Sequence, residues 1–330
     1  MNSDIAPIAA MRDVIEAISA STNLVITGHR TPDGDAIGAV YALGMALRSI
    51  GKDVRVVLEE YNGRFSVIPG RELLYGGEPH ELEPDTFFAL DCGSVERMGA
   101  AVCLLKKARC TVNIDHHVSN TMFAQINHVD SLASSTCEIV FRILNELDSA
   151  CVFNKDIASA LYAGIIYDTG GLRHNSTTLA TMDAARRLME FDIPFTRIYN
   201  ELMHMRTLTE IKAMDRALKN LYLLEDGAIA CTYITCDDLN ETGAIIADLG
   251  DICEYVVNIA GVQLATFIYQ RLDGKGCKVS MRSKKIPING IAQHLGGGGH
   301  SLAAGSDFGG TLEQAQQVVT GMLRELLWTE

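Results

Sequence analysis

Short apolar segments alternate with helix-like segments through the first half of the chain. The apolar segments, rich in β-branched and aromatic residues, are NLVITG (23–28), VRVVLE (54–59), TFFALD (86–91) and CTVNID (110–115). Segments with helical spacing of their apolar residues occupy 35–51, 135–147 and 156–170. Strands that alternate with helices in this way are typical of a parallel sheet with helices on both faces. We therefore predict an α/β fold with a parallel sheet for this part of the chain.

The second half of the chain has a different pattern, which predicts a second domain. Residues from about 178 to 222 have wholly helical spacing. Beyond them, strand-like runs occupy 228–235, 262–272 and 277–283, and helix-like segments occupy 289–295 and 311–328. A chain of 330 residues accommodates two domains of ordinary size. We expect one domain over 1–190, a helical linker over 191–222, and a smaller α/β domain with a mixed sheet over 223–330.

Composition and charge argue against several classes of protein. Apolar residues make up 48% of the chain, and no apolar run approaches the roughly 18 residues of a membrane-spanning helix. The nine cysteines form no paired CxxC motifs, which argues against a zinc site or a disulfide framework and favours reduced thiols. The formal net charge of −13 argues against an extended track for long nucleic acids. We therefore expect a cytoplasmic protein without a membrane partner.

Acidic and histidine residues stand at the ends of three of the predicted strands and of one helical segment. They are His29, Asp33 and Asp35, then Asp91, then Asp115, His116 and His117, and finally Asp168. Because ligands of an open parallel sheet bind outside the carboxyl ends of its strands, we expect these side chains to meet at one rim. Each residue alone also fits a structural role. Asp33 lies in a turn-like PDGD, and Asp91 or Asp168 could cap a helix.

Five carboxylates and three imidazoles at one rim would repel and desolvate one another unless cations were bound there. Oxygen and imidazole ligands without thiolate suit Mn²⁺ or Mg²⁺, while Zn²⁺, Co²⁺ and Fe²⁺ are alternatives. So many ligands exceed the needs of one ion, which favours two. Paired divalent ions about 3.5–4 Å apart are a device of phosphoryl transfer. The pattern therefore predicts a two-metal phosphoryl-transfer site.

Five sequence motifs carry a resemblance to a known family. They are GHRTPDGDAIGA (28–39), DCG (91–93), IDHH (114–117), YDTGGLR (167–173) and GGGGHSLAAG (296–305). The first four resemble the motifs of the DHH phosphoesterase superfamily, and the fifth resembles the signature of the accompanying DHHA1 domain. The resemblance implies a Rossmann-like N-terminal DHH domain, a C-terminal DHHA1 domain and an active site in the cleft between them. It also implies a phosphoesterase that uses two divalent ions, Mn²⁺ first, with Mg²⁺ or Co²⁺ as alternatives.

The same resemblance assigns roles to the rim residues. The implied metal ligands are His29, Asp33, Asp35, Asp91, His116 and Asp168. His29 and Asp33 would hold one ion, Asp91 would bridge, and the remaining three would hold the other. Asp115 would orient a histidine ligand, as carboxylates commonly do. His117 would contact the substrate phosphate or assist the leaving group. The expected catalytic residues are thus Asp91, His117 and Asp115.

Substrate contacts are expected in the second domain. Consecutive glycines let backbone N–H groups approach an anion, so Gly297, Gly298 and Gly299 predict a phosphate nest, with His300 bonding the same phosphate. A flexible linker is the alternative explanation for such a run. Arg282, in the motif SMRS, could bind phosphate through two parallel hydrogen bonds.

The resemblance is to the NrnA-type group, which implies hydrolysis of short oligoribonucleotides (nanoRNA and dinucleotides), of 3′-phosphoadenosine 5′-phosphate, or of both, to mononucleotides and phosphate. The alternatives are a RecJ-like single-strand exonuclease, a cyclic or linear dinucleotide phosphodiesterase, a family II inorganic pyrophosphatase, and a nucleotide-binding sensor without turnover. The Gly-rich GGGGH argues against the pyrophosphatase, and the complete set of acids and histidines argues against the sensor. The helical linker and the apolar C-terminal helix are compatible with a homodimer.

Overall fold

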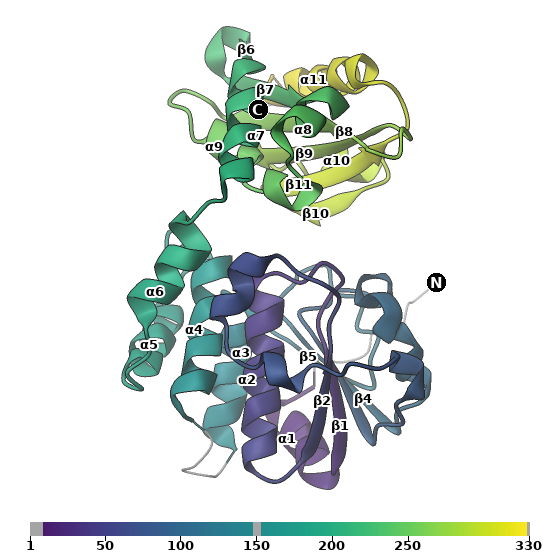
Figure 1. Cartoon of the computed structure of the whole chain (residues 1–330), viewed down its shortest axis with the longest axis vertical. Helices are drawn as coiled ribbons and strands as arrows, with labels where there is room; N and C mark the ends of the chain where they lie inside the picture. The colour runs from purple at the N-terminus through teal and green to yellow at the C-terminus, as the bar shows by residue number, and fades with distance from the viewer. Residues whose placement is uncertain (1–8, 148–152, 329–330) are drawn as a thin grey trace. The chain divides into compact units, whose positions relative to one another are not determined.

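The computed structural model describes residues 9–147 and 153–328, which form two units (Figure 1). The first unit spans Met1–Met205 and the second spans Arg206–Glu330. The predicted linker, 191–222, is divided between them. Helix α6 (Phe195–Tyr199) and a π-helical turn (Asn200–His204) belong to the first unit, and α7 (Leu208–Lys219) belongs to the second. Residues 178–222 are therefore not wholly helical, because extended backbone at Met205 and Thr207 separates these helices.

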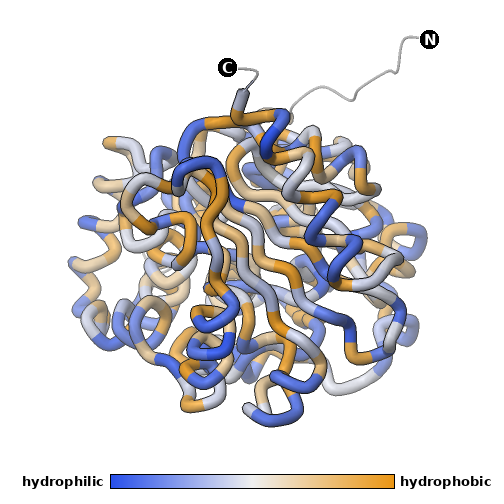
Figure 2. The backbone as a smooth tube through the Cα atoms, turned by 90° about the horizontal axis from the view of Figure 1, so that it is seen from above, coloured by the Kyte–Doolittle hydropathy of each residue, from blue (hydrophilic) through white to orange (hydrophobic). Residues whose placement is uncertain are grey.

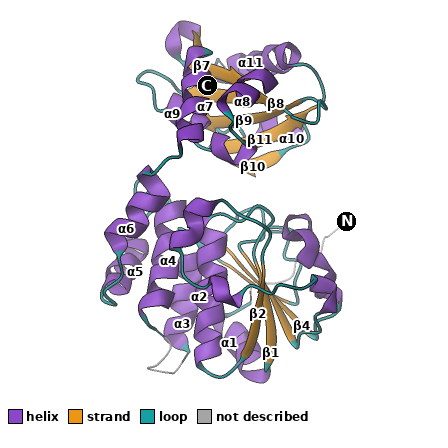
Figure 3. Cartoon of the chain, viewed as in Figure 1, coloured by secondary structure: helices purple, strands orange, loops and turns teal. Residues whose placement is uncertain are grey.

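The sheet of the first unit has five parallel strands in the order β2-β1-β3-β4-β5. Figure 3 labels β1, β2 and β4 among them. The strands are β1 (Asn23–Thr27), β2 (Asp53–Val57), β3 (Thr86–Leu90), β4 (Cys110–Asp115) and β5 (Ile126–Val129). The first four coincide with the predicted apolar segments, and the parallel α/β fold is confirmed. The direction of strand addition reverses between β1 and β3. These two strands therefore frame a topological switch point, the position where open sheets bind ligands.

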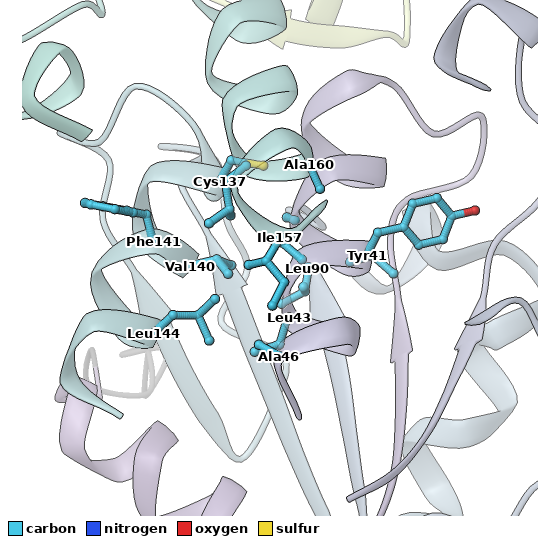
Figure 4. Close-up of a cluster of buried hydrophobic side chains, with 14 of the residues drawn as sticks. Tyr41, Leu43, Ala46, Leu90, Cys137, Val140, Phe141, Leu144, Ile157 and Ala160 are labelled. Atoms are coloured by element: carbon cyan, nitrogen blue, oxygen red, sulfur yellow. The ribbon is translucent and has the colours of Figure 1, made fainter. Parts of the chain in front are cut away.

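The two faces of this sheet are covered by two different cores, and alternate residues of β3 enter one or the other. In β3, Phe88 and Leu90 enter the larger core, whereas Phe87 and Ala89 enter the smaller one. The larger core, shown in part in Figure 4, is completed by α1 (Met11–Ala20), α2 (Gly34–Ser49), α3 (Thr136–Glu146), α4 (Lys155–Asp168) and α5 (Leu179–Met189). The smaller core is closed by 3₁₀ turns over Val95–Lys106.

Helices α2 and α4 cross at glycines, and this close approach helps to build the rim. A Cβ on Gly38 of α2 would lie 2.5 Å from the carbonyl oxygen of Ala160 in α4. A Cβ on Gly164 of α4 would overlap Cys137 of α3 and would lie 2.9 Å from Asp35 Oδ1. Larger residues would therefore force the helices apart. The glycines allow Asp35 to reach the beginning of α3.

The second unit contains a six-stranded sheet in the order β10-β11-β9-β8-β7-β6. Its strands are β6 (Tyr222–Leu224), β7 (Ile229–Ile234), β8 (Leu264–Gln270), β9 (Cys277–Ser283), β10 (Gly298–His300) and β11 (Ala303–Phe308). The β7–β8 pair is parallel and the other pairs are antiparallel, so the predicted mixed sheet is confirmed. One face is covered by α7, α8 (Cys236–Thr242) and α9 (Ile252–Val257), and the other by α10 (Asn289–His294) and α11 (Leu312–Leu327).

Hydrophobic stretches alternate with hydrophilic turns along the backbone (Figure 2). This distribution matches a fold in which each sheet is covered on both faces. Within residues 9–147 and 153–328, no helix is both long enough and apolar enough to cross a bilayer.

Candidate metal centre

The carboxyl ends of β1, β3 and β4 bring the expected ligands together beside the switch point. Among the described residues, three groups of side chains have ligand atoms within 4.8 Å of one another. The groups are His29–Asp33–Asp91, Asp91–His116–His117 and Asp35–His116–Asp168. Asp91 and His116 each belong to two groups, so the three groups form one continuous set. We call these seven residues the ligand cluster.

His29 and Asp33 follow β1 and form one side of the ligand cluster. His29 Nδ1 lies 2.9 Å from the Arg30 carbonyl, which can only accept, so Nδ1 carries the hydrogen and Nε2 faces the carboxylates. The distance from Nε2 to Asp33 Oδ2 is 3.8 Å. Asp33 also caps α2, because its Oδ1 accepts hydrogen bonds from the N–H groups of Asp35 and Ala36. One carboxylate oxygen of Asp33 thus fixes the helix and leaves the other for a cation.

Asp35 lies in the first turn of α2 and is completely buried. Its Oδ2 accepts a hydrogen bond from the Thr136 N–H at 2.7 Å, and its Oδ1 accepts one from the Cys137 N–H at 2.9 Å. These donors belong to the N-terminal turn of α3, where backbone N–H groups lack helical partners. The beginning of α3 therefore compensates part of the cost of burying this carboxylate.

Asp91, directly after β3, lies at the centre of the ligand cluster. Its Oδ2 is 3.5 Å from His29 Nε2, and its Oδ1 is 3.6 Å from His116 Nε2. The Thr136 hydroxyl donates to the same Oδ1 at 3.1 Å. The backbone of Asp91 has φ +55°, in the left-handed region that Asp tolerates better than most residues. This conformation turns the buried side chain toward ligands from both sides of the cluster.

His116 and Asp168 complete the other side of the ligand cluster. His116 Nε2 lies 3.6 Å from Asp168 Oδ2, and Asp168 is the last residue of α4. The side chain of Asp168 is about 30% exposed, whereas that of Asp91 is about 3% exposed. The cluster therefore has a buried centre and an accessible edge at Asp168.

Asp115 is completely buried and holds the His117 ring rather than the ring of His116. Its Oδ1 accepts hydrogen bonds from His117 Nδ1 at 2.7 Å and from the His116 backbone N–H at 2.8 Å. The resemblance implies that Asp115 orients a histidine ligand. In the structure its side-chain contact is instead with the histidine expected to face the substrate. With Nδ1 bound to Asp115, the Nε2 edge of the His117 ring is directed away from this carboxylate.

The ionisable groups of the ligand cluster perturb one another strongly. Burial raises the pKa of Asp35 well above its usual range, and the charges of Asp91 and Asp168 raise it further. Burial also favours the neutral form of Asp91, but the hydrogen bond from His29 and the charges of the histidines outweigh it and lower the pKa of Asp91. For His29, burial lowers the pKa, whereas hydrogen bonds and charges of Asp33 and Asp91 raise it more, to about 10. A cation at His29 Nε2 would replace the proton held there.

The donors of the ligand cluster fit divalent metal ions. Four carboxylates and three imidazoles converge, and none of the three groups contains a thiolate. Hard or borderline divalent cations prefer this combination of oxygen and nitrogen ligands. Bound cations would also balance the negative charge that Asp35, Asp91 and Asp168 impose on one another.

The second unit places Arg282 and His300 on strands β9 and β10, which pair with opposite edges of β11. Arg282 of β9 pairs in register with Ala303 of β11, which pairs with His300 of β10. The Arg282 guanidinium donates from Nη1 to the Met281 carbonyl at 2.9 Å, and its Nε lies 3.7 Å from Glu254 Oε2. The glycine run is part of a β-hairpin and is not a linker. The Gly297 N–H donates to the Ala292 carbonyl, so this amide already has a partner.

Several residues around the ligand cluster are not identified from the sequence. Thr136 and Cys137 supply the amides that hold Asp35, and Asn120 donates to Asp115 Oδ2 at 2.6 Å. The Ser/Thr-rich run before α3 signals a helix start, but it does not reveal which side chain that helix end receives. For Asn120, its proximity to IDHH in the sequence is the one available signal.

Comparisons with known proteins agree with this architecture. The DHH family, N-terminal domain, matches residues 23–165, and the DHHA1 domain matches residues 227–326. A crystal structure titled as an exopolyphosphatase-related protein from Bacteroides fragilis superposes with a TM-score of 0.89 at 25% identity. It covers 97% of this chain and 98% of that chain.

Two curated relatives extend over nearly the whole chain. A Thermus thermophilus protein named bifunctional oligoribonuclease and PAP phosphatase NrnA is 29% identical over 322 residues, covering 96% of this chain and 94% of the relative. A Bacillus subtilis protein of the same name is 26% identical over 301 residues, covering 89% of this chain and 92% of the relative. With both domains matched in order, the chain belongs to the DHH/DHHA1 family of phosphoesterases and is NrnA-like.

Proposed function

We propose that this protein hydrolyses short oligoribonucleotides, 3′-phosphoadenosine 5′-phosphate, or both, to mononucleotides and phosphate. The ligand cluster carries the proposal, because Asp91 joins two groups of potential metal ligands at the switch point of the sheet. The names of the relatives from Thermus thermophilus and Bacillus subtilis support these substrate classes. The net charge of −13 also favours short substrates over long polymers.

We propose that the ligand cluster holds two divalent ions, Mn²⁺ in preference to Mg²⁺ or Co²⁺. His29 and Asp33 would hold one, Asp35, His116 and Asp168 the other, and Asp91 both. When bound, such ions lower the pKa of water and neutralise charge on a phosphoryl group. The chain itself contributes orientation: the N-terminal turn of α3 fixes Asp35, and the Arg30 carbonyl fixes the His29 ring.

His117 is the residue that we assign to the leaving group. Hydrogen bonding to Asp115 and the charges of Asp91 and Asp115 outweigh burial, which lowers the pKa of His117, and raise that pKa to about 9. A protonated ring can donate from Nε2 while Nδ1 stays on Asp115. A hydrogen bond to the departing oxygen would stabilise the negative charge that develops there.

We further propose that Arg282, His300 and the backbone of the Gly297–Gly299 run bind a substrate phosphate. Gly297 contributes no donor of its own, because its N–H is bonded to the Ala292 carbonyl. Arg282 lies on β9, and Gly298, Gly299 and His300 lie on β10, so that β11 separates the two strands by one position in the sheet; this placement supports the assignment. An arginine guanidinium can bind two phosphate oxygens at once, which would orient the substrate as well as attract it.

Product release from a substrate panel tests the proposed function. The panel contains 3′-phosphoadenosine 5′-phosphate, a 5′-phosphorylated RNA dinucleotide, an RNA five-mer, long single-stranded DNA, cyclic di-AMP and pyrophosphate. Each substrate is measured with Mn²⁺, Mg²⁺ or Co²⁺. Turnover confined to the short nucleotides, fastest with Mn²⁺, is the expected result. Degradation of long DNA, or of pyrophosphate alone, would contradict the substrate class, and metal binding without any turnover would favour the sensor.

A further inference from the structure

Asn120 links Asp115 to the loop that follows β4. Its Nδ2 amino group lies 2.6 Å from Asp115 Oδ2 and 2.7 Å from Asn113 Oδ1. Its Oδ1 accepts a hydrogen bond from the Met122 N–H at 2.7 Å. The two ends of one amide thus serve different purposes: the amino end holds Asp115, and the carbonyl end holds the loop.

Asn113 connects this contact to the strand before it. The Asn113 side chain is fully buried in β4, and its Nδ2 donates to the Ala89 carbonyl at 3.0 Å and to the Cys92 carbonyl at 3.2 Å. Because Ala89 and Cys92 flank Asp91 closely in the chain, the Asn113–Asn120 pair ties the end of β3 to the end of β4. Asn120 is therefore placed by the same two strand ends that supply Asp91 and His117.

The two oxygens of Asp115 are held by different partners. Oδ1 accepts from His117 Nδ1 and from the His116 N–H, while Oδ2 accepts from Asn120. Losing the donor at Oδ2 would leave part of a fully buried carboxylate unsatisfied and free to rotate. Rotation would move Oδ1 and with it the His117 ring. Small displacements of this kind are costly, since a misplacement of about 1 Å can reduce a rate about 100-fold.

We propose that Asn120 is a positioning residue: it fixes the Asp115 carboxylate, which fixes the orientation of His117 toward the leaving group. This inference rests on the proposed function and deepens it, because it names the contact on which the His117 orientation depends. Asn120 does not itself belong to the ligand cluster. Its removal therefore leaves the metal ligands in place and weakens the step that His117 serves.

Asn120→Asp is the informative substitution because the new side chain has nearly the same shape. It keeps an oxygen for the Met122 N–H and replaces the amino group that donates to Asp115 with a carboxylate oxygen, which cannot donate and repels the Asp115 carboxylate. We expect kcat on the RNA dinucleotide to fall about 10–100-fold, the usual effect of removing a partner that orients an active-site group, with KM nearly unchanged. Mn²⁺ affinity, measured by calorimetry, should equal that of the wild type. Asn120→Ala provides the same test if the Asp variant does not fold.

Asn127→Asp is the matched control. Asn127 is buried, donates to the Ala124 and Met122 carbonyls, and accepts from the Ala124 N–H, so it supports the same loop without contacting Asp115. We expect this variant to retain its kcat once folded. An equal loss of kcat in the two variants would assign the effect to the loop and overturn the proposal.

A double-mutant cycle with His117→Ala separates positioning from a general structural role. If Asn120 acts through His117, Asn120→Asp should cost almost nothing further in the His117→Ala background. Both single variants should also lose less activity on a 4-nitrophenyl phosphate ester than on the RNA dinucleotide, because the 4-nitrophenolate leaving group needs little assistance. Additive losses, or equal losses on both substrates, would overturn the proposal.

A spectroscopic measurement tests the positioning independently of turnover. In the Mg²⁺-loaded protein, the His117 Nδ1–H bound to Asp115 should give a downfield proton resonance, assigned by its loss in His117→Ala. We expect that resonance to shift or broaden in Asn120→Asp and to persist in Asn127→Asp. An unchanged resonance in Asn120→Asp would overturn the positioning role, even if the enzyme is active. If the wild-type protein hydrolyses none of the nucleotides, the proposed function is wrong. The resonance would still show in that case whether Asn120 positions His117.

Discussion

The ligand cluster of the first unit and the Arg282 region of the second unit hold their charges in opposite ways. Asp35 and Asp91 are 0% and 2% exposed, and their oxygens are fixed by the turn that begins α3. Arg282 is about 30% exposed, and its nearest acidic group is Glu254 at 3.7 Å. Loss of one group from the buried arrangement leaves the remaining buried charges without compensation. Loss of one group from the exposed arrangement is partly compensated by solvent.

This difference predicts how each region responds to substitution. Removing one carboxylate from the ligand cluster leaves the buried groups that contact it without their charge partner, so we expect a large loss of activity or stability. Removing one exposed cation changes a contact that solvent partly replaces, so the consequence is small. The following predictions test this contrast, beginning with the largest expected change in free energy and ending with the smallest.

Asp91→Asn should have the largest effect. Asn tolerates the left-handed backbone at this position and keeps the size of the side chain, but it cannot supply the charge shared by two ligand groups. We expect turnover to fall on the order of 10³-fold, or about 4 kcal/mol in the activation free energy, while the fold survives. Calorimetric titration with Mn²⁺ and steady-state rates provide the measurement.

Asp183→Asn, on the exposed surface of α5, is a suitable control for the Asp91 variant because the Asp183 side chain forms a surface ion pair with Arg186 at 3.2 Å. It should retain activity and metal binding. Substantial Mn²⁺-dependent activity in Asp91→Asn would show that Asp91 is not the shared ligand.

Metal binding should stabilise the first unit, and by more at higher pH. The pKa of His29 is raised in the folded state, so its contribution to stability is present below about pH 6.5 and is lost as the pH rises toward 10. The raised pKa of Asp35 acts in the same direction, because its buried charge also opposes folding as the pH rises. Metal binding releases these protons and is therefore tighter at higher pH.

Thermal unfolding with and without Mg²⁺ or Mn²⁺ measures this effect. A metal concentration about 100-fold above Kd should add about 2.7 kcal/mol to the free energy of unfolding. At one fixed metal concentration, the increase should be larger at pH 8.5 than at pH 6.5, and Asp91→Asn should abolish most of it. Equal increases at the two pH values would contradict the assignment of these groups as proton-releasing ligands.

Much of the first sheet and its rim can be predicted because buried parallel strands leave a simple sequence signal. Segments such as TFFALD are apolar on both faces, and the residue at their end then points to the rim. Strand β5 gives no such signal, since INHV contains two polar residues and pairs on one side only. The hairpin of β10 and β11 is also missed, because glycine and alanine have low strand propensity.

The contacts that tune the site are harder to predict because they join distant parts of the chain. Asp35 receives its donors from Thr136 and Cys137, and no local pattern records which helix end meets which carboxylate. The local sequence places Asp115 beside two histidines but does not decide which ring it holds. The close packing of α2 against α4 at Gly38 and Gly164 brings Asp35 to the beginning of α3. The loop held by Asn120 helps to fix the Asp115 carboxylate that holds His117.

Arg282→Ala should have a moderate effect confined to substrate binding. Loss of a charge-assisted contact to phosphate should raise KM about tenfold, equivalent to about 1.4 kcal/mol, with Mn²⁺ affinity unchanged. Glu254→Gln provides the opposite test, because it removes the carboxylate that competes for the guanidinium. It should lower KM slightly. Unaltered KM in Arg282→Ala would remove Arg282 from the substrate site.

Gly298→Ala and Gly297→Ala should separate a substrate requirement from a packing requirement. A Cβ on Gly298 would meet no atom within 4 Å, so alanine should change the free energy of unfolding by less than about 0.5 kcal/mol. A Cβ on Gly297 would overlap the Gly305 carbonyl, and overpacking of this kind costs about 1–3 kcal/mol. Any effect of Gly298→Ala on activity therefore reports on the substrate and not on the fold.

We expect Gly298→Ala to raise KM about threefold, because the added methyl group would keep a phosphate from the backbone N–H groups of the glycine run. Urea unfolding and steady-state rates, measured on the same preparations, distinguish the two variants. A normal KM together with normal stability in Gly298→Ala would show that phosphate does not approach this backbone. Binding in the second unit would then depend on side chains such as Arg282. The difference between the fixed ligand cluster and the adaptable substrate region would then be larger, because side chains alone, without a preformed backbone site, would bind the phosphate.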